Sequence, residues 1–132
     1  MILIDSSLLI PLFRDVSGAK KRALRSALRG REFVLSRFNQ LELLQGAANE
    51  EEWSGLDAYL ANQAYAEAID TTWHEGARMF FELRRKGKTI RSVIDCMIAQ
   101  ICIEQKLTLF HNDRDFEIVA THFKLREQRL QI

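Results

Sequence analysis

Short apolar runs alternate with longer segments of helical periodicity along this chain, and that alternation restricts the fold more than any other feature. Runs of strand length occupy Met1–Asp5, Glu32–Leu35 and Leu107–Phe110. We expect two weaker strands, at Tyr65–Ile69 and Arg129–Ile132. Strands that are joined through helices pair in parallel, and the helices cover both faces of the sheet. The pattern therefore predicts an α/β fold on a central parallel sheet of four to five strands.

The segments between these runs have the apolar spacing and the end signals of helices. We expect helices from Ser6 or Ser7 through Phe13, at Ala19–Arg29, around Phe38–Ala48, at Glu51–Asn62, around Trp73–Arg84, at Val93–Gln105 and at Phe116–Ala120. Gly55 weakens the fourth of these predictions, because glycine disfavours helix interiors. The Val93–Gln105 segment is apolar on nearly all sides, which indicates a buried helix.

Length and composition are those of one globular unit. With 132 residues, of which 47% are hydrophobic and 28% charged, the chain fits a single domain over 1–132. The formal net charge of +1 indicates no particular partner. Cys96 and Cys102 lie on different faces of one predicted helix, so we interpret them as reduced core residues. No apolar run approaches the roughly 20 residues that span a bilayer, and we expect a soluble, cytoplasmic protein.

Two acidic residues, Asp5 and Asp113, follow predicted strands and so fall at the edge where a parallel sheet binds ligands, beyond the C-terminal ends of its strands. If the sheet is parallel, further acids among Glu42, Asp95 and Asp115 converge on the same edge. Each has a simple structural explanation when it is taken alone. Asp5, and either aspartate after the Leu107–Phe110 strand, can cap the helix that follows. Glu42 alone would be an ordinary solvated helix residue, and Asp95 has capping-box spacing from Ser92.

Taken together, the acids need a further explanation. Two carboxylates about 5 Å apart repel by roughly 3 kcal/mol at an effective dielectric constant near 20. Several carboxylates on one sheet edge must therefore either be protonated or share a bound cation. Oxygen ligands suit Mg²⁺ or Mn²⁺, whereas no Cys/His cluster in this chain has the spacing of a zinc site.

Four segments carry a resemblance to a known family. They are Ile2–Ile10 around Asp5, Asn39–Leu43 around Glu42, Arg91–Ala99 around Asp95 and His111–Phe116 around Asp113. In order, spacing and total length they resemble the acidic motifs of PIN-domain nucleases, and more narrowly the VapC-type toxins of bacterial type II toxin–antitoxin pairs. The resemblance covers essentially the whole chain. It implies a PIN-like α/β/α sandwich and endonucleolytic cleavage of RNA with Mg²⁺ or Mn²⁺, which leaves 5′-phosphate and 3′-hydroxyl ends.

The resemblance also assigns roles to individual residues. Asp5, Glu42, Asp95 and Asp113 match the catalytic, metal-binding acids. Of these, we expect Asp5 and Asp95 to ligate directly, and the other two to ligate directly or through water. Ser6 and Asp115 match auxiliary positions, whereas Asn39 and the His111–Asn112 pair depart from the Thr or Ser that is usual there. The family further implies a cognate antitoxin and a homodimer as partners.

Basic and apolar surfaces are less informative. The blocks Lys20–Arg31 and Arg84–Arg91 are mostly solvated helix faces in our interpretation. Arg91, Arg114 and Lys88 are close enough in sequence to the acids to contact an RNA phosphate, and the two arginines could instead neutralise the acids. The Trp53–Tyr65 region, with Leu56, Tyr59 and Leu60, is either core or the groove that an antitoxin occupies.

Several alternatives stay open at this point. The chain could be a PIN-type RNA-processing nuclease outside a toxin–antitoxin pair, or a module that binds RNA or a partner without cutting. Phosphatases and phospho-receiver domains also use acidic Mg²⁺ pockets, but they need a partner acid or a strand-borne lysine that is missing near Asp5. A pair among His74, His111 and His122 would cut RNA without metal, although nothing in the sequence pairs them.

Overall fold

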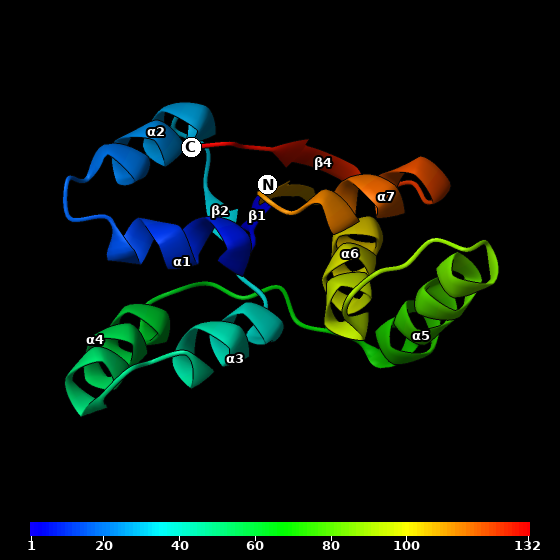
Figure 1. The fold of residues 1–132 in the computed structure, drawn as a ribbon, viewed down its shortest axis with the longest axis horizontal. Coiled ribbons are helices and arrows are strands. Elements are labelled where there is room, and N and C mark those ends of the chain that lie inside the picture. Colours follow the sequence, from blue (N-terminus) through cyan, green and yellow to red (C-terminus); the bar gives the residue numbers. More distant parts are fainter.

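The computed structural model describes residues 1–132 as four strands and seven helices (Figure 1). In chain order the elements are β1 (Ile2–Ile4), α1 (Ser6–Arg14), α2 (Ala19–Leu28), β2 (Phe33–Val34), α3 (Arg37–Gln45), α4 (Glu50–Ala61), α5 (Asp70–Arg85), α6 (Val93–Gln105), β3 (Thr108–His111), α7 (Arg114–His122) and β4 (Arg126–Arg129). None of the seven helices combines the length and the apolar composition that crossing a membrane requires.

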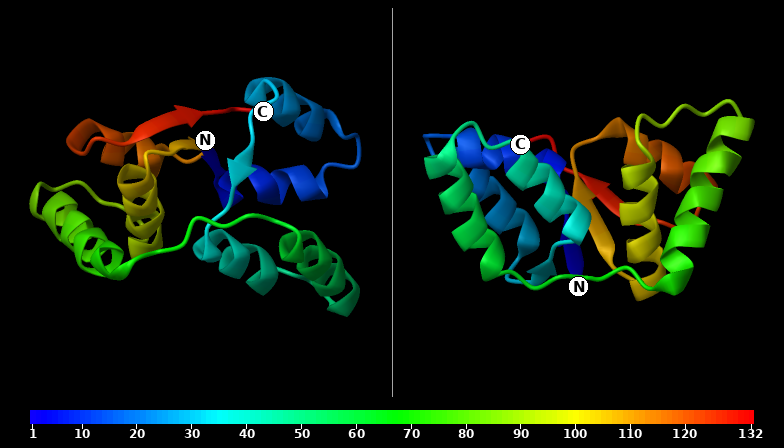
Figure 2. Two further views of the ribbon diagram at one scale, coloured as in Figure 1. Left: turned by 180° about the vertical axis from the view of Figure 1, so that it is seen from behind. Right: turned by 90° about the horizontal axis from the view of Figure 1, so that it is seen from below.

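The four strands form one sheet in the order β2-β1-β3-β4, and every neighbouring pair is parallel. Successive residues of β1 point to opposite faces, as the pleat requires. Ile2 and Ile4 belong to one core cluster and Leu3 to the other. Helices α1 to α4 contribute to the first cluster and α5 to α7 to the second. Figure 2 shows the same division into two groups of helices. The predicted α/β/α sandwich on a parallel sheet is confirmed.

The order of the strands creates a crevice between β1 and β3. These strands are neighbours, yet the helices that follow them pack on opposite faces of the sheet. Leu8 of α1 lies in the first core cluster and Phe116 of α7 in the second. The connections therefore diverge at this point, which is where open parallel sheets bind ligands. Asp5 follows β1 directly, and Asp113 comes two residues after β3.

Two of the predicted strands differ from the structure. The Tyr65–Ile69 segment forms only a single parallel bridge, between Leu35 and Tyr65, and is not a strand. The last strand runs from Arg126 to Arg129, so the predicted Arg129–Ile132 range is three residues late. The apolar Leu130 and Ile132 suggested a strand of their own. The observed strand is an edge strand of polar residues that pairs with β3 on one side only.

The predicted helices are all present, and most of them have shifted ends. Helix α6 has the predicted bounds, whereas α3 ends at Gln45 and not near Ala48. Helix α5 begins three residues before Trp73, and Gly87 follows its end with a positive φ of 72°. Gly55 lies inside α4 despite its low helix propensity, because the helix is held by its own Asn49 cap and by the buried Leu60.

Two helical glycines give a matched test of the packing between α5 and α6. A Cβ added to Gly55 would meet nothing within 4 Å, whereas one added to Gly76 would overlap Sδ of the buried Met97. We expect Gly55→Ala to raise the free energy of unfolding by about 0.5–1 kcal/mol, and Gly76→Ala to lower it by about 1 kcal/mol. Urea denaturation would measure both, and equal gains would show that Met97 moves aside without cost.

Candidate metal centre

Asp5 lies at the end of β1 and caps α1. Its Oδ2 accepts a hydrogen bond from the backbone N–H of Ser7 at 2.9 Å, and its own N–H donates to the Phe110 carbonyl at 2.9 Å. Asp5, and not Ser6 or Ser7, therefore caps the helix. The residue is only 4% exposed. Burial raises the pKa of the Asp5 carboxyl, although hydrogen bonds from Ser7 and Asn39 act in the opposite direction.

Asn39 connects Asp5 to Glu42, a role that the sequence analysis missed. Its Nδ2 donates to Asp5 Oδ1 and to Ser6 Oγ, each at 3.1 Å. Ser6 Oγ in turn donates to Glu42 Oε1 at 3.2 Å. Asn39 Oδ1 accepts from the backbone N–H and the hydroxyl of Ser36, which forms the capping box of α3. The sequence did carry a signal for this role, because Asn39 lies three residues after Ser36 and three before Glu42, a spacing that brings side chains together in a helix.

Asp95 is the third residue of α6, and no protein group donates a hydrogen bond to its carboxylate. Ser92 caps the helix by accepting from the backbone N–H of Ile94 at 3.1 Å. The predicted capping box between Ser92 and Asp95 is therefore wrong. The pKa of Asp95 is raised to about 7, first by burial and then by four acidic neighbours: Asp5, Asp113, Glu42 and Asp115. An unpaired carboxylate beside four others is the kind of group that a bound cation satisfies.

Asp113 and Asp115 share one arginine. Asp113 caps α7 by accepting from the Asp115 N–H at 2.9 Å. Nη2 of Arg91 donates to both Asp113 oxygens, at 2.7 and 2.8 Å, and its Nε donates to Asp115 Oδ2 at 3.1 Å. Hydrogen bonding to Asp115 and the charges of both acids raise the pKa of Arg91. The sequence left two roles open for Arg91, contact with an RNA phosphate or neutralisation of the acids, and the structure shows the second.

The His111–Asn112 turn holds Asp113 in place, although these two residues differ from those usual in the family that the sequence resembles. His111 Nδ1 accepts the Asp113 N–H at 3.1 Å, and its Nε2 donates to Glu127 of β4 at 2.6 Å. The N–H of Asn112 donates to Ser7 Oγ of α1 at 2.9 Å. The turn is thereby fixed to the elements on both sides of the crevice.

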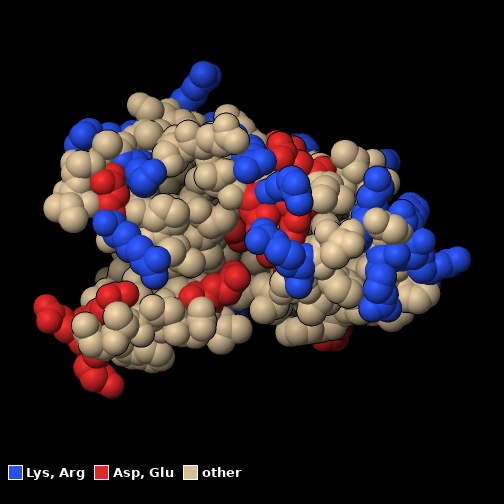
Figure 3. All heavy atoms as spheres, viewed as in Figure 1, with Lys and Arg blue, Asp and Glu red and all other residues tan.

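Three carboxylates lie close enough together to share one cation. Asp95, Asp113 and Asp115 each offer an oxygen within 4.8 Å of the others. This set includes Asp115, expected only as an auxiliary residue, and does not include Asp5. The charge of Glu42 contributes to the raised pKa of Asp95, and burial and then the charge of Asp5 raise the pKa of Glu42 itself. A partly buried set of oxygen donors fits a divalent hard metal ion. Figure 3 shows acidic side chains gathered in the middle of one face, with Lys and Arg around them.

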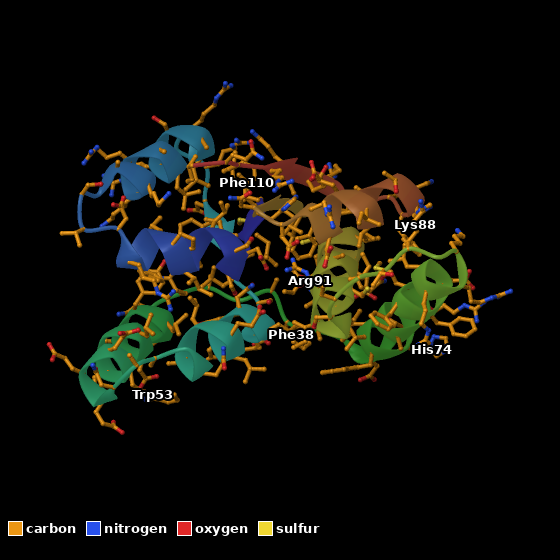
Figure 4. The ribbon with its side chains drawn as sticks, in the orientation of Figure 1. Phe38, Trp53, His74, Lys88, Arg91 and Phe110 are labelled. Atoms are coloured by element: carbon orange, nitrogen blue, oxygen red, sulfur yellow. The ribbon has the colours of Figure 1, made fainter.

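A polar hollow adjoins the acids. Its lining consists of Thr89, Arg91, Asn112, Asp113, Arg114, Asp115 and Arg129. Arg114 is exposed and pairs with no carboxylate. Arg129 was not among the predicted site residues, because only the pairing of β4 with β3 brings it to Asn112. Lys88 is not part of the lining, and Figure 4 shows it on the loop between α5 and α6, to the outside of Arg91.

The histidines and cysteines lie apart from this chemistry. His74, His111 and His122 belong to α5, β3 and α7, and no hydrogen bond joins any two of them. The alternative of a histidine pair therefore gains no support. Burial raises the pKa of Cys96 to about 12 and also raises the pKa of Cys102. Both thiols are free and buried, as predicted for core residues.

The Trp53–Tyr65 region is divided between core and surface. Leu60 is 1% exposed and belongs to the core. Tyr59 packs edge-on against Phe13, with ring centroids 5.0 Å apart. Leu56 lines a hollow together with Ile10 and Phe13, and the same hollow extends to Glu42. Trp53 lines a second, apolar groove whose other large apolar residues are Phe38, Leu41, Leu44, Trp73 and Ile101.

Comparison with known proteins agrees with this fold. The profile of the PIN domain family matches residues 2–121. Ribonuclease VapC11 of Mycobacterium tuberculosis is 30% identical over 126 residues, which cover 91% of this chain and 92% of that protein. The crystal structure of VapBC2 from Rickettsia felis bound to a promoter DNA fragment has a TM-score of 0.78 at 19% identity, and covers 99% of this chain and 100% of that one. VapBC-5 of M. tuberculosis has a TM-score of 0.70 at 20% identity, with 98% of each chain covered.

The family is thereby established. The chain belongs to the PIN-domain family and, within it, to the VapC group.

Asp95 provides a test of the electrostatics that does not depend on activity. Its pKa of about 7, against an ordinary 3.8, means that the folded state holds the proton more tightly than the unfolded state does. Wild-type stability without metal therefore falls as the pH rises from about 4 to about 7. In chelator at pH 8 we expect Asp95→Asn to be more stable by roughly 1–3 kcal/mol. This advantage shrinks as the pH falls.

Thermal unfolding at several pH values measures this effect. The exposed Asp57 of α4 supplies the control, because Asp57→Asn removes the same charge outside the acidic site. We expect that control to leave the unfolding temperature unchanged at every pH. An Asp95→Asn protein that is less stable than wild type at pH 8 would contradict the prediction.

Proposed function

We propose that this protein is a divalent-metal-dependent endoribonuclease and the toxin of a type II toxin–antitoxin pair. The observation that carries the proposal is the convergence of Asp95, Asp113 and Asp115 at the crevice, with Asp5 and Glu42 beside them. The name ribonuclease of the M. tuberculosis relative supports the activity, and the description of VapBC-5 as a toxin–antitoxin system supports the role. We further propose that residues 1–132 work as one PIN unit in the cytoplasm, where free thiols stay reduced.

In this proposal Asp95, Asp113 and Asp115 hold Mg²⁺ or Mn²⁺, and Asp5 and Glu42 complete the acidic site. The ion would supply Lewis-acid chemistry, which activates water for attack on phosphorus and stabilises charge on the phosphoryl oxygens. The protein's own hydrogen bonds orient the carboxylates of Asp5 and Glu42. Asn39 and the Ser7 N–H fix the Asp5 carboxylate, and Ser6 fixes Glu42.

The RNA strand would lie over the polar hollow beside these acids. Arg114 is the free cation of that hollow, since it is exposed and pairs with no acid. Arg129 is half-buried and held by Asn112 and Glu117, at 3.0 and 2.9 Å. We propose that Arg114 contacts phosphate and that Arg129 shapes the wall of the hollow, because phosphate contacts fix the register of a nucleic acid without reading its sequence.

The proposed antitoxin would occupy the hollow between α1 and α4. Apolar side chains of Ile10, Phe13 and Leu56 line it, and Glu42 of the acidic site also belongs to its lining. A bound peptide segment would therefore bury apolar side chains in this hollow and contact the acidic site at Glu42. This continuity supports inhibition by direct blocking, since one partner would cover both surfaces.

Cleavage by the purified protein tests the activity. We expect Asp5→Asn and Asp95→Asn each to slow the cleavage of single-stranded RNA by at least about 100-fold, because changes around metal ligands already cost about 10- to 100-fold. Chelator should stop the wild type, Mg²⁺ or Mn²⁺ should restore it, and the products should carry 5′-phosphates. Asp57→Asn is the matched control and should cut normally.

Each other outcome favours a different function. Cleavage that persists in chelator and leaves cyclic phosphates would favour the histidine mechanism. RNA binding without cleavage by the wild type would favour a module that does not cut. Brief expression in cells, followed by sequencing of RNA 5′ ends, separates a toxin from a processing nuclease. A toxin should arrest growth with the wild type and not with Asp95→Asn.

The proposed homodimer would use the second groove. Leu41 and Trp73 line it and are 55% and 58% exposed, and Arg37 and Glu67 provide both signs of charge at the groove. We expect Leu41→Glu to convert a dimer to a monomer, because it places a charge in the apolar contact. Light scattering after gel filtration measures the mass. Val16→Glu, at a fully exposed apolar residue elsewhere, should leave the dimer intact.

A further inference from the structure

Arg91 is a cation already bound to the acidic site. A single nitrogen, Nη2, donates to both oxygens of Asp113, at 2.7 and 2.8 Å. The backbone N–H and Nε of Arg91 both donate to Asp115 Oδ2, at 3.1 Å. The two acids come from the start of α7, whereas Arg91 lies just before α6. The contacts therefore join two elements across the site.

These contacts occupy the same oxygens that a metal ion would need. Both oxygens of Asp113 carry the guanidinium, and Oδ1 also accepts the Asp115 N–H at 2.9 Å. Asp95, in contrast, accepts no hydrogen bond from the protein, and Oδ1 of Asp115 accepts none. Of the three carboxylates that can share one cation, Asp113 alone has both oxygens occupied by a positively charged group.

The guanidinium is also free to leave. The Arg91 side chain is 73% exposed, while those of Asp113 and Asp115 are 17% and 5% exposed. Nη1 of Arg91 has no partner, and no aromatic ring stacks on the guanidinium, so only the two acids hold it. Movement into solvent would leave no cavity in the core. Arg129, by comparison, has a side chain that is 30% exposed. It contacts Asn112 and Glu117, and neither Asp113 nor Asp115.

We propose that Arg91 is a displaceable internal counterion, which competes with the divalent ion for Asp113 and leaves that carboxylate when metal binds. The inference rests on the metal centre of the proposed function. Without metal, Arg91 stabilises the folded protein by neutralising carboxylates that would otherwise repel one another. With metal, the same contact opposes binding, because the guanidinium and the ion cannot both take the Asp113 oxygens.

Two arginines in the same hollow make the test specific. Arg91→Gln and Arg114→Gln each remove one positive charge from the hollow, but only Arg91 contacts the acids. A general change in the electrostatic field would therefore affect both variants alike. Direct competition would affect Arg91→Gln alone.

Calorimetric titration with MnCl₂ measures the competition. We expect Arg91→Gln to bind Mn²⁺ about five- to tenfold more tightly than wild type, and Arg114→Gln to stay within about twofold. In chelator, Arg91→Gln should unfold at a lower temperature than wild type, and saturating Mn²⁺ should remove that difference. Arg91→Lys keeps the charge without the planar fork, folds with the acids still neutralised, and should fall between wild type and Arg91→Gln.

Three results would overturn the inference. Equal tightening in Arg91→Gln and Arg114→Gln would mean that net charge alone sets the affinity. Weaker Mn²⁺ binding by Arg91→Gln and Arg91→Lys would mean that Arg91 positions the acids for the metal and does not oppose it. Absence of Mn²⁺ binding in the wild type would refute the metal centre itself. That last result differs from the first two, in which the wild type binds metal and the proposed function stands.

Discussion

Repulsion among partly buried carboxylates is the constraint on which the rest of this structure depends. Asp5 and Asp113 are placed by β1 and β3, the two central strands, whose Leu3 and Leu109 are completely buried. A central parallel strand is fixed by hydrogen bonds and packing on both faces. Only such a rigid support can keep several acids close, when each ionised pair about 5 Å apart costs roughly 3 kcal/mol at an effective dielectric constant near 20. The apolar sheet and the acidic edge are therefore parts of one arrangement.

The acids on the two sides of the site receive hydrogen bonds from different kinds of donor. On the side of α1 and α3, neutral donors from Ser7, Asn39 and Ser6 satisfy Asp5 and Glu42. On the side of α7, the guanidinium of Arg91 satisfies Asp113 and Asp115. Asp95 has no donor of its own, and burial followed by the charges of acids from both sides raises its pKa. Of the five acids, Asp95 alone accepts no hydrogen bond from the protein, and a bound ion would supply the missing partner.

Much of this could be predicted from sequence, and what could not be has physical reasons. Apolar runs with acids at their ends were enough to place the sheet and the acidic edge. Strand β4 was misplaced because a polar edge strand has no apolar alternation, and its pairing with β3 comes only from the folded chain. Asn39 was named only as a departure from a pattern, because its contact with Asp5 requires α3 to pack against α1. The Ser92–Asp95 capping box does not form, because the Ser92 side chain accepts from the N–H of Ile94, and spacing alone does not distinguish this cap from a capping box.

The strand order also determines when the site can exist during synthesis. β1 is made first, yet its partner β3 and the acids of α7 come from the last quarter of the sequence. Asp5 and Asp115 are 110 positions apart. At about 5–20 residues per second, roughly 5–20 s separate the synthesis of the two residues. A nascent chain therefore emerges without an assembled acidic site, and the complete site forms only after α7 has left the ribosome.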